Sequence, residues 1–279
     1  MSKKKRKHIP LPLLPPGITA IDTHCHLDMD AYDQDRQAVI ENSLAAGIGT
    51  IITIGIDLES SRAALALAEQ YSHIYCSIGV HPHNITGLTD QYYKELTALA
   101  AHPKVVAYGE IGMDRVRCQT PEDLQQEHFR RQVQIAKQLN LPLIIHDREA
   151  HQTVMEILES EAPFPAGGIM HCFSGDRELA RQVLDLGFLI SIPGVVTFNN
   201  AEMLQEVVRT TPLNCLVLET DGPYLSPVPR RGKRNEPANI LYIAEKIAQL
   251  KEIELAEVVS CTTENARKIF RLQNRKGES

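Results

Sequence analysis

The chain has 279 residues, of which 43% are hydrophobic and 23% charged, and its formal net charge is −6. This composition is that of an ordinary globular protein, and no apolar run approaches the roughly 20 residues that cross a bilayer. The negative charge excludes a protein that coats duplex DNA with its whole surface, while a local basic patch stays compatible with it. Six scattered cysteines without a CxxC pair, and no export signal, predict reduced thiols and a cytoplasmic location.

The first 16 residues are basic and then rich in proline. Residues 3–7 are all Lys or Arg, and four prolines follow by residue 16. Prolines interrupt any apolar signal segment and favour an extended backbone. We therefore predict a mobile arm at residues 1–16, for which a solvated tail is favoured over a nuclear signal or a nucleic-acid contact. One domain is predicted at residues 17–273, with a short tail at 274–279.

Short apolar runs rich in Ile and Val alternate with helical stretches along this domain, as is typical of strands covered on both faces. The runs lie at 18–21, 49–54, 74–79, 105–109, 142–145, 168–170, 188–192 and 216–218. The clearest helical stretches lie at 58–70, 123–139, 238–250 and 262–270. Eight such units in about 235 residues predict a single-domain α/β protein, a TIM (β/α)8 barrel. The alternative, a doubly wound open sheet, normally has a glycine-rich phosphate loop after its first strand, where this chain has His24-Cys-His26.

Unusual polar side chains follow the predicted strands, at the end of a barrel that carries active sites. His24 and His26 are two residues apart, so an extended backbone points both to one side. Equivalent places on four other strands hold Glu110, His146, His171 and Asp221. Barrel closure would bring all six together. Four imidazoles and two carboxylates can hold two divalent metal ions, and the mixed donors fit Mg, Mn or Zn.

Each of these residues also has an explanation without a metal. A histidine at a strand end can bond to backbone, Glu110 can cap a helix, and Asp221 before Gly-Pro can start a turn. The coincidence of six is what makes the metal site the prediction. Two ions of charge +2 against two carboxylates leave about +2, which favours an anionic substrate such as a phosphate ester.

Six motifs contain these residues and occur in one order along the chain. They read Asp-Thr-His-Cys-His-Leu at 22–27, Gly-Val-His-Pro-His at 79–83, Gly-Glu-Ile-Gly at 109–112, Leu-Pro-Leu-Ile-Ile-His-Asp-Arg-Glu-Ala at 141–150, His-Cys-Phe-Ser-Gly at 171–175 and Glu-Thr-Asp-Gly-Pro-Tyr at 219–224. From about residue 19 to residue 270 the chain resembles the TatD family of metal-dependent deoxyribonucleases, in the amidohydrolase superfamily. The resemblance implies a barrel with a two-metal site that hydrolyses DNA phosphodiesters from a 3′ end.

The resemblance also implies how the ions are shared. One ion would be held by His24, His26, Glu110 and Asp221, and the other by Glu110, His146 and His171. The arginine-rich loop at 230–237 would lie beside the substrate. The chain departs from the family pattern at residues 113–118, where relatives commonly carry an aromatic, and at Asp147. Both departures lie at the mouth and bear on substrate fit.

We predict that the enzyme cleaves DNA with a metal-activated water that attacks phosphorus in line. The predicted catalytic residues are Asp221, as general base, and Glu110, which would bridge and orient the ions. The residues predicted to contact substrate are Arg148, His81, Tyr224, Arg231 and Arg234, with Arg115 as a further candidate. Arginines would neutralise phosphate, and Tyr224 would stack on a base. The alternatives are salt bridges or solvated turns for the arginines, a structural role for His81 and simple packing for Tyr224.

The predicted partner is DNA, single-stranded or at its 3′ ends, with no membrane and with a monomer favoured. Two other function classes stay open. The same ions can activate water against a carbonyl, so the substrate can be a small ester or amide, or the ester that links a D-amino acid to tRNA. A non-catalytic nucleic-acid-binding or scaffolding protein with a structural metal is the second, although structural sites usually close with four ligands.

Overall fold

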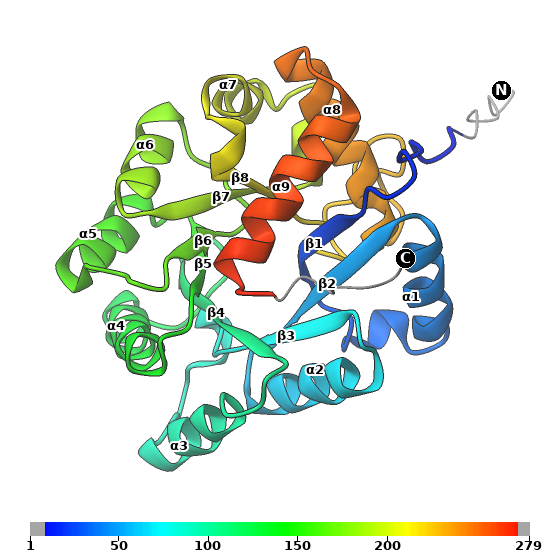
Figure 1. The fold of residues 1–279 in the computed structure, drawn as a ribbon. Helices are drawn as coiled ribbons and strands as arrows, with labels where there is room; N and C mark the ends of the chain where they lie inside the picture. Colours follow the sequence, from blue (N-terminus) through cyan, green and yellow to red (C-terminus); the bar gives the residue numbers. More distant parts are fainter. Residues whose placement is uncertain (1–8, 273–279) are drawn as a thin grey trace, which may run out of the picture.

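Eight parallel strands follow one another around a barrel in the order of the sequence (Figure 1). The structure is a computed structural model that describes residues 9–272. The strands are β1 (Ala20–Cys25), β2 (Ile48–Ile54), β3 (Ile74–Ile78), β4 (Val105–Asp114), β5 (Leu143–Arg148), β6 (Gly168–Met170), β7 (Phe188–Ile192) and β8 (Leu216–Leu218). The predicted (β/α)8 barrel is confirmed, and each predicted run contains or overlaps one strand.

Helices fill the connections between the strands and surround the barrel (Figure 1). The α-helices are α1 (Arg36–Ala45), α2 (Leu58–Gln70), α3 (Asp90–Leu99), α4 (Glu122–Leu139), α5 (His151–Glu161), α6 (Arg177–Asp185), α7 (Glu202–Thr210), α8 (Ile240–Lys251) and α9 (Leu255–Ile269). Short 3-10 helices are η1 (Asp30–Tyr32), η2 (Pro82–Asn84), η3 (Gly194–Thr197), η4 (Leu213–Cys215) and η5 (Pro237–Asn239). The helix predicted at 58–70 is confirmed by α2, and that at 123–139 by α4, which begins one residue earlier.

The last helix is longer than its sequence pattern predicts. α9 begins at Leu255, not at residue 262. Val258 and Val259 are buried on this helix, so its apolar face starts well before Thr262. The Thr262 hydroxyl donates back to the carbonyl oxygen of Val258 at 2.8 Å, which satisfies it inside the helix instead of at a cap. The predicted boundary at 262 is therefore wrong.

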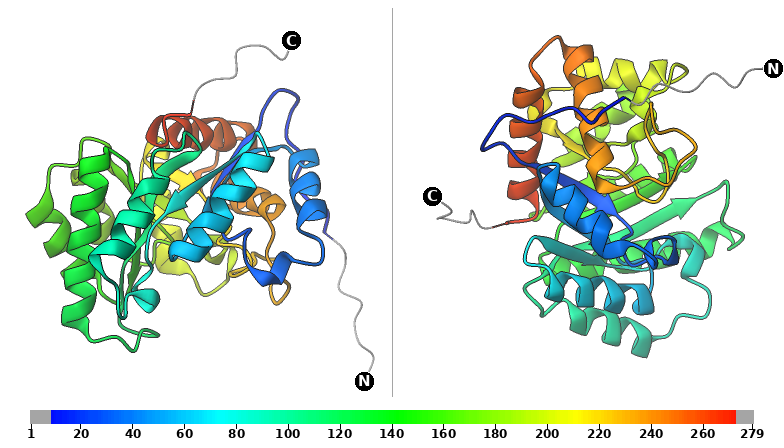
Figure 2. Two further views of the ribbon diagram at one scale, coloured as in Figure 1. Left: turned by 90° about the horizontal axis from the view of Figure 1, so that it is seen from below. Right: turned by 90° about the vertical axis from the view of Figure 1, so that its right-hand side faces the viewer.

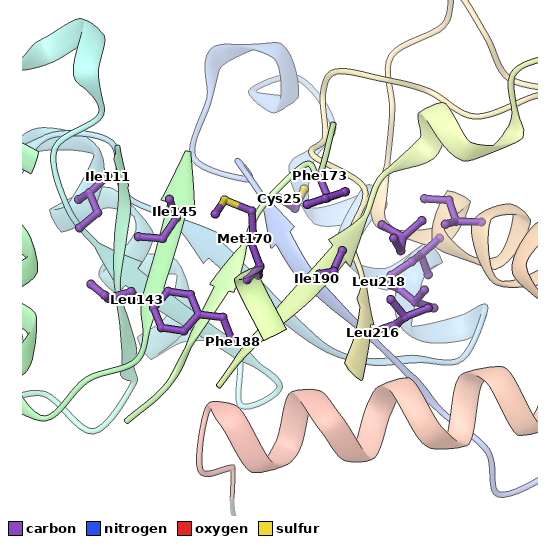
Figure 3. Close-up of a cluster of buried hydrophobic side chains, with 14 of the residues drawn as sticks. Cys25, Ile111, Leu143, Ile145, Met170, Phe173, Phe188, Ile190, Leu216 and Leu218 are labelled. Atoms are coloured by element: carbon purple, nitrogen blue, oxygen red, sulfur yellow. The ribbon is translucent and has the colours of Figure 1, made fainter. Parts of the chain in front are cut away.

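Side chains along the strands alternate between two apolar layers. Leu143 and Ile145 of β5 belong to the layer between the barrel and its helices, whereas Ile144 between them belongs to the layer inside the barrel. Figure 3 shows part of the outer layer, including Phe188 from β7. Burial on both faces explains why the strands read as continuous apolar runs. Each fully buried large aliphatic side chain contributes about 1.5–3 kcal/mol to stability.

α9 closes one end of the barrel and leaves the other end open. Phe270, just after α9, is 2% exposed and packs in the inner layer against residues such as Ile21 and Val106. In both views of Figure 2, α9 lies at one end of the barrel and the segment that joins β8 to α8 lies at the other. The carboxyl ends of the strands therefore face an open mouth opposite α9, as in other barrels of this type.

The chain ends lie partly outside the described residues. Of the predicted arm, residues 1–8 are not described, and the predicted tail at 274–279 is not described either. The carbonyl of Ile9 accepts a hydrogen bond from the Tyr242 hydroxyl at 2.8 Å, and Leu14 packs against the core. The arm and the domain bounds stay predictions. Within residues 9–272, no helix is both long enough and apolar enough to span a membrane.

Candidate metal centre

The first and last strands meet at the carboxyl end of the barrel and bring their polar residues together. The amide of Asp221 donates to the carbonyl of His24 at 2.8 Å, and the amide of His26 donates to the carbonyl of Gly222 at 2.7 Å. The buried carboxylate of Asp22 accepts from the amide of Thr220 at 2.9 Å, which holds the same junction. His24 and His26 are thereby fixed against Asp221, which is almost 200 residues away in the chain.

β4 runs beyond its predicted end, so Glu110 lies inside a strand and not after it. The extension exists because β4 pairs with β5, with Gly112 opposite His146 and Asp114 opposite Arg148. A Cβ atom at Gly112 would lie 1.9 Å from the carbonyl oxygen of His146, so only glycine permits this approach. The pairing holds Glu110 beside His146 at the mouth.

Four ligand atoms converge on the β1–β8 side of the mouth. The Nε2 atoms of His24 and His26 lie 3.3 Å apart. Glu110 Oε2 lies 3.4 Å from His24 Nε2 and 3.8 Å from His26 Nε2. Asp221 Oδ1 lies 3.8 Å and 3.4 Å from the same two nitrogens. The four residues come from three places in the chain and form one compact group.

The second carboxylate oxygen of Glu110 faces the other histidines. Glu110 Oε1 lies 2.7 Å from His146 Nδ1, 3.5 Å from His171 Nε2 and 3.6 Å from His81 Nε2. The imidazoles of His24 and His171 stack with ring centroids 3.5 Å apart, which joins the two groups. Glu110 is thus placed to be shared between two neighbouring centres.

These two groups fit divalent cations. The buried Nε2 atoms of His24 and His26 lie 3.3 Å apart and face one carboxylate oxygen each from Glu110 and Asp221. A cation among these four atoms would bind to all of them. Sets of three potential ligands lie close together at His24, His26 and Asp221 and again at His81, Glu110 and His146. Nitrogen and carboxylate donors in one site suit Mn and Zn, and the carboxylates add affinity for Mg. The second set includes His81, for which the sequence predicted a substrate contact, with a structural role as the alternative, and not a metal ligand.

Glu219 is a functional candidate that the sequence analysis missed. It is fully buried, its Oε2 lies 2.9 Å from His171 Nδ1, and its Oε1 accepts from the amide of Cys172 at 2.7 Å. A carboxylate on the far nitrogen of a ligand imidazole fixes the orientation of the ring and its basicity. Its position two residues before Asp221 is a signal in the sequence, because residues at that spacing in an extended stretch point to the same side.

Charges within the cluster shift several pKa values. Burial lowers the pKa of His171, but the carboxylates of Glu219 and Glu110 outweigh it and raise the pKa to about 10. Burial also opposes charge on His146, whose hydrogen bonds with Asp114 and Glu110 raise its pKa to about 9. For Glu110, burial raises the pKa, but the surrounding histidines hold it well below its ordinary value. In the metal-free centre His146 and His171 are therefore imidazoliums paired with carboxylates, whereas burial lowers the pKa of His24 and of His81 and keeps both neutral.

Metal binding is expected to release protons. A histidine whose pKa is raised keeps its proton below that pKa, so His146 and His171 carry protons at pH 7, and an ion must displace them to bind. Apparent affinity should rise with pH up to about 10, by up to about tenfold per pH unit for each proton released. Titration calorimetry of Mn²⁺ in two buffers of different ionisation enthalpy measures this release. Heats that are identical in the two buffers would contradict it.

Three of the predicted substrate contacts lie around the mouth. Arg148 ends β5, is exposed, and forms an ion pair with no residue in the described part of the chain. The Tyr224 side chain is 52% exposed, and its ring lies 6.3 Å from that of His26 in an edge-on arrangement. His81 packs edge-on against His146, with ring centroids 4.4 Å apart. Their contact with substrate stays a prediction.

The remaining arginine candidates differ in how fully their guanidinium groups are already paired within the protein. Arg234 bonds to both oxygens of Asp35 at 2.7 and 2.8 Å and lies over the ring of Tyr32, so it anchors its loop. Arg115 is paired with Glu122. The exposed guanidinium of Arg231 lies over the ring of Phe198, 4.3 Å from its centroid. Its N–H groups form no hydrogen bond or ion pair with the side chains of residues 9–272. The roles of these residues toward substrate stay predictions.

The fold and the ligand set define a metal-dependent hydrolase built on a (β/α)8 barrel. The sequence profile described as TatD related DNase matches residues 21–271, nearly all of the described chain. The protein therefore belongs to the TatD family. This confirms the predicted resemblance and the predicted enzyme class.

Curated relatives and solved structures agree with this assignment. The chain is 45% identical over 251 residues to the uncharacterized metal-dependent hydrolase YabD of Bacillus subtilis, covering 90% of this chain and 98% of the relative. It is 34% identical over 255 residues to the 3′-5′ ssDNA/RNA exonuclease TatD of Salmonella typhimurium, covering 89% and 98%. The crystal structure of YJJV, a TatD homolog from Escherichia coli K12, superposes with a TM-score of 0.84 at 30% identity, covering 91% and 98%.

Proposed function

We propose that the protein is a nuclease that uses two divalent ions to hydrolyse phosphodiester bonds at the 3′ end of single-stranded DNA. The observation that carries this proposal is the position of Glu110, whose two carboxylate oxygens face different sets of histidines. A shared carboxylate between two centres is typical of sites that hold both the attacking and the leaving oxygen of a phosphate ester. The exonuclease name of the Salmonella relative supports the substrate class.

Each ion has its own proposed set of residues. One set is His24, His26, Glu110 and Asp221, and the other is Glu110, His146 and His171. When bound, two divalent ions supply Lewis acidity and activation of water. Mg, Mn and Zn all fit these donors. Glu219 keeps the His171 ring turned toward Glu110 through its bond to Nδ1.

Asp221 is the proposed general base. Burial raises its pKa, but the hydrogen bond from His26 and the charges of nearby histidines lower it overall, so the carboxylate is ionised at neutral pH. Its Oδ1 lies at the mouth, 3.4 Å from His26 Nε2. Its side chain is 13% exposed, so water reaches it from the mouth. The carboxylate is therefore placed to accept the proton of an attacking water.

The rim of the mouth supplies the proposed contacts with the strand. Arg148 offers a guanidinium that no carboxylate in residues 9–272 engages, which suits the scissile phosphate. Tyr224 offers an exposed ring on the opposite side, and bases of any identity stack on such rings. Arg231, like Tyr224, lies on the segment that joins β8 to α8 and packs over the ring of Phe198. A monomeric state and a cytoplasmic location remain predictions.

The test is a comparison of substrates under defined metals. The protein is stripped of metal, reloaded with Mg²⁺, Mn²⁺ or Zn²⁺, and incubated with a single-stranded oligonucleotide labelled at its 5′ end. Stepwise shortening from the 3′ end, dependent on the added metal, is the expected result. A panel of carboxylic esters and an aminoacyl-tRNA are run beside it. Turnover of these esters while the oligonucleotide stays intact would overturn the nuclease proposal.

A further inference from the structure

A pocket opens beside the metal centre, between η2 and the segment that joins β4 to α4. Its volume is about 440 Å³, and its lining includes His83, Thr86, Arg117, Cys118 and Thr120. Part of this wall is the segment 113–118, in which the chain departs from the pattern it resembles. The pocket is therefore a place where this protein can differ from its relatives in substrate contact.

His83 forms the wall between this pocket and the metal centre. Its Nε2 atom lies 2.8 Å from Asp114 Oδ2, and that oxygen lies 3.5 Å from Nε2 of His146. The ring of His83 also packs edge-on against that of His81, with centroids 4.5 Å apart, and His81 Nε2 lies 3.6 Å from Glu110. His83 thus connects the pocket to the metal centre through Asp114 on one side and His81 on the other.

Hydrogen bonds within the protein fix the wall of the pocket, so its shape does not require a ligand. Asp114 Oδ1 accepts hydrogen bonds from the amides of Val116 and Arg117, both at 2.7 Å, which fixes the turn after β4. The Cys118 thiol donates to the carbonyl of Pro82 at 3.1 Å, which ties this turn to η2. A site formed in advance costs less ordering when a ligand binds.

The charge of the pocket favours an anion. Arg117 is exposed, and no carboxylate in residues 9–272 forms an ion pair with it, in contrast to Arg115, which is bound to Glu122. The hydroxyls of Thr86 and Thr120 lie 3.4 Å apart on the same lining. None of the described residues that line this pocket is acidic. A free guanidinium beside hydroxyl donors is the set of groups that recognises a phosphate.

Neighbouring hollows do not share this chemistry. The pocket on the other side of His83 is lined by Asp57 and Glu59. A larger one between α5 and α6 is lined by acidic side chains that include Glu156 and Asp176. Carboxylates repel a phosphodiester strand, so among these three pockets only the one at Arg117 suits a further phosphate.

We propose that the Arg117 pocket binds the phosphate that lies 5′ to the scissile one on the same nucleic-acid strand. The proposal rests on the proposed nuclease function and extends it by one nucleotide. A dinucleotide without a terminal phosphate has only the scissile phosphate and leaves the pocket empty, whereas a trinucleotide supplies its ligand.

Arg117→Ala tests the pocket by the length of the substrate. We expect kcat/KM on trinucleotides and longer strands to fall about tenfold, mainly through KM, because one charge-assisted contact is lost. The dinucleotide should be cleaved at the wild-type rate. Binding of a longer single strand should lose about 0.7 from its slope of log affinity against log salt, the contribution of one phosphate. Arg117→Lys should restore the salt slope and only part of the KM.

Lys268→Ala is the matched control, since it removes one exposed positive charge from α9 at the closed end of the barrel. It should change neither the length dependence nor the salt slope. If the wild type shortens long strands and Arg117→Ala keeps the wild-type length dependence and salt slope, the pocket proposal is overturned while the nuclease stands. If the wild type cleaves no nucleic acid with any metal, both proposals are overturned together.

Discussion

Glu110→Gln is expected to remove both divalent ions and all measurable hydrolysis while the barrel stays folded. One Glu110 oxygen faces His24 and His26 and the other faces His146 and His171, so a single change weakens both centres. Loss of a group that merely orients a ligand costs about 10–100-fold in metal affinity, and loss of a shared ligand should cost more. Glutamine keeps the volume of the buried side chain, so packing is maintained.

The measurement is metal content after dialysis against a defined low concentration of Mn²⁺, beside hydrolysis of the labelled oligonucleotide. The variant should retain neither ion, and proton release on adding metal should shrink because His146 and His171 each lose one of the carboxylates that raise their pKa values. Glu122→Gln is the control, because Glu122 is an exposed carboxylate paired with Arg115 outside the cluster. Wild-type metal content in Glu110→Gln would show that the centres do not share this residue.

Asp221→Asn is expected to lower hydrolysis by about 10²- to 10⁴-fold, the usual contribution of a positioned proton acceptor. Asparagine keeps the shape of the side chain, and the backbone bond from residue 221 to His24 does not depend on the carboxylate. The fold and the group around His146 and His171 should therefore persist. The variant is predicted to keep at least one of the two ions, in contrast to Glu110→Gln.

This difference separates a proton acceptor from a structural ligand. Single-turnover rates of Asp221→Asn are measured over a range of pH at saturating metal, so that weaker metal binding is compensated. The slow rate of the variant should persist at every metal concentration. The wild-type rate should fall at low pH as the Asp221 carboxylate takes up a proton, and this fall should be absent from the variant. Recovery of the wild-type rate at high metal would assign Asp221 to metal binding alone and would overturn its role as base.

Several features of the protein could be predicted from its sequence because they depend on local patterns. Ile- and Val-rich runs such as 188–192 predict buried parallel strands, and their alternation with helical periods predicts the barrel. In a barrel all the strands end at the same mouth, so polar residues at five strand ends had to converge. His24, Glu110 and Asp221 are on the candidate list for this reason, and the structure brings them together.

Other features needed the tertiary structure, because they depend on pairing between distant segments. β4 extends to Asp114 only because β5 continues beside it, and that extension divides the oxygens of Glu110 between two groups. Burial of Glu219 against His171 likewise follows from barrel closure, since the two lie 48 positions apart. No local pattern encodes a contact of this kind.

The arginines show the same limit most clearly. Arg115, Arg117 and Arg234 look alike in sequence, as exposed cations near the mouth. In the folded chain Arg234 is held by Asp35 and Arg115 by Glu122, whereas Arg117 is left without a carboxylate among the described residues. Whether a guanidinium is free for substrate depends on which acidic side chain folding places within about 4 Å of it. The sequence by itself therefore determined the strands, the metal-ligand candidates and the family, and the tertiary structure decided how those ligands are shared and which charges are free.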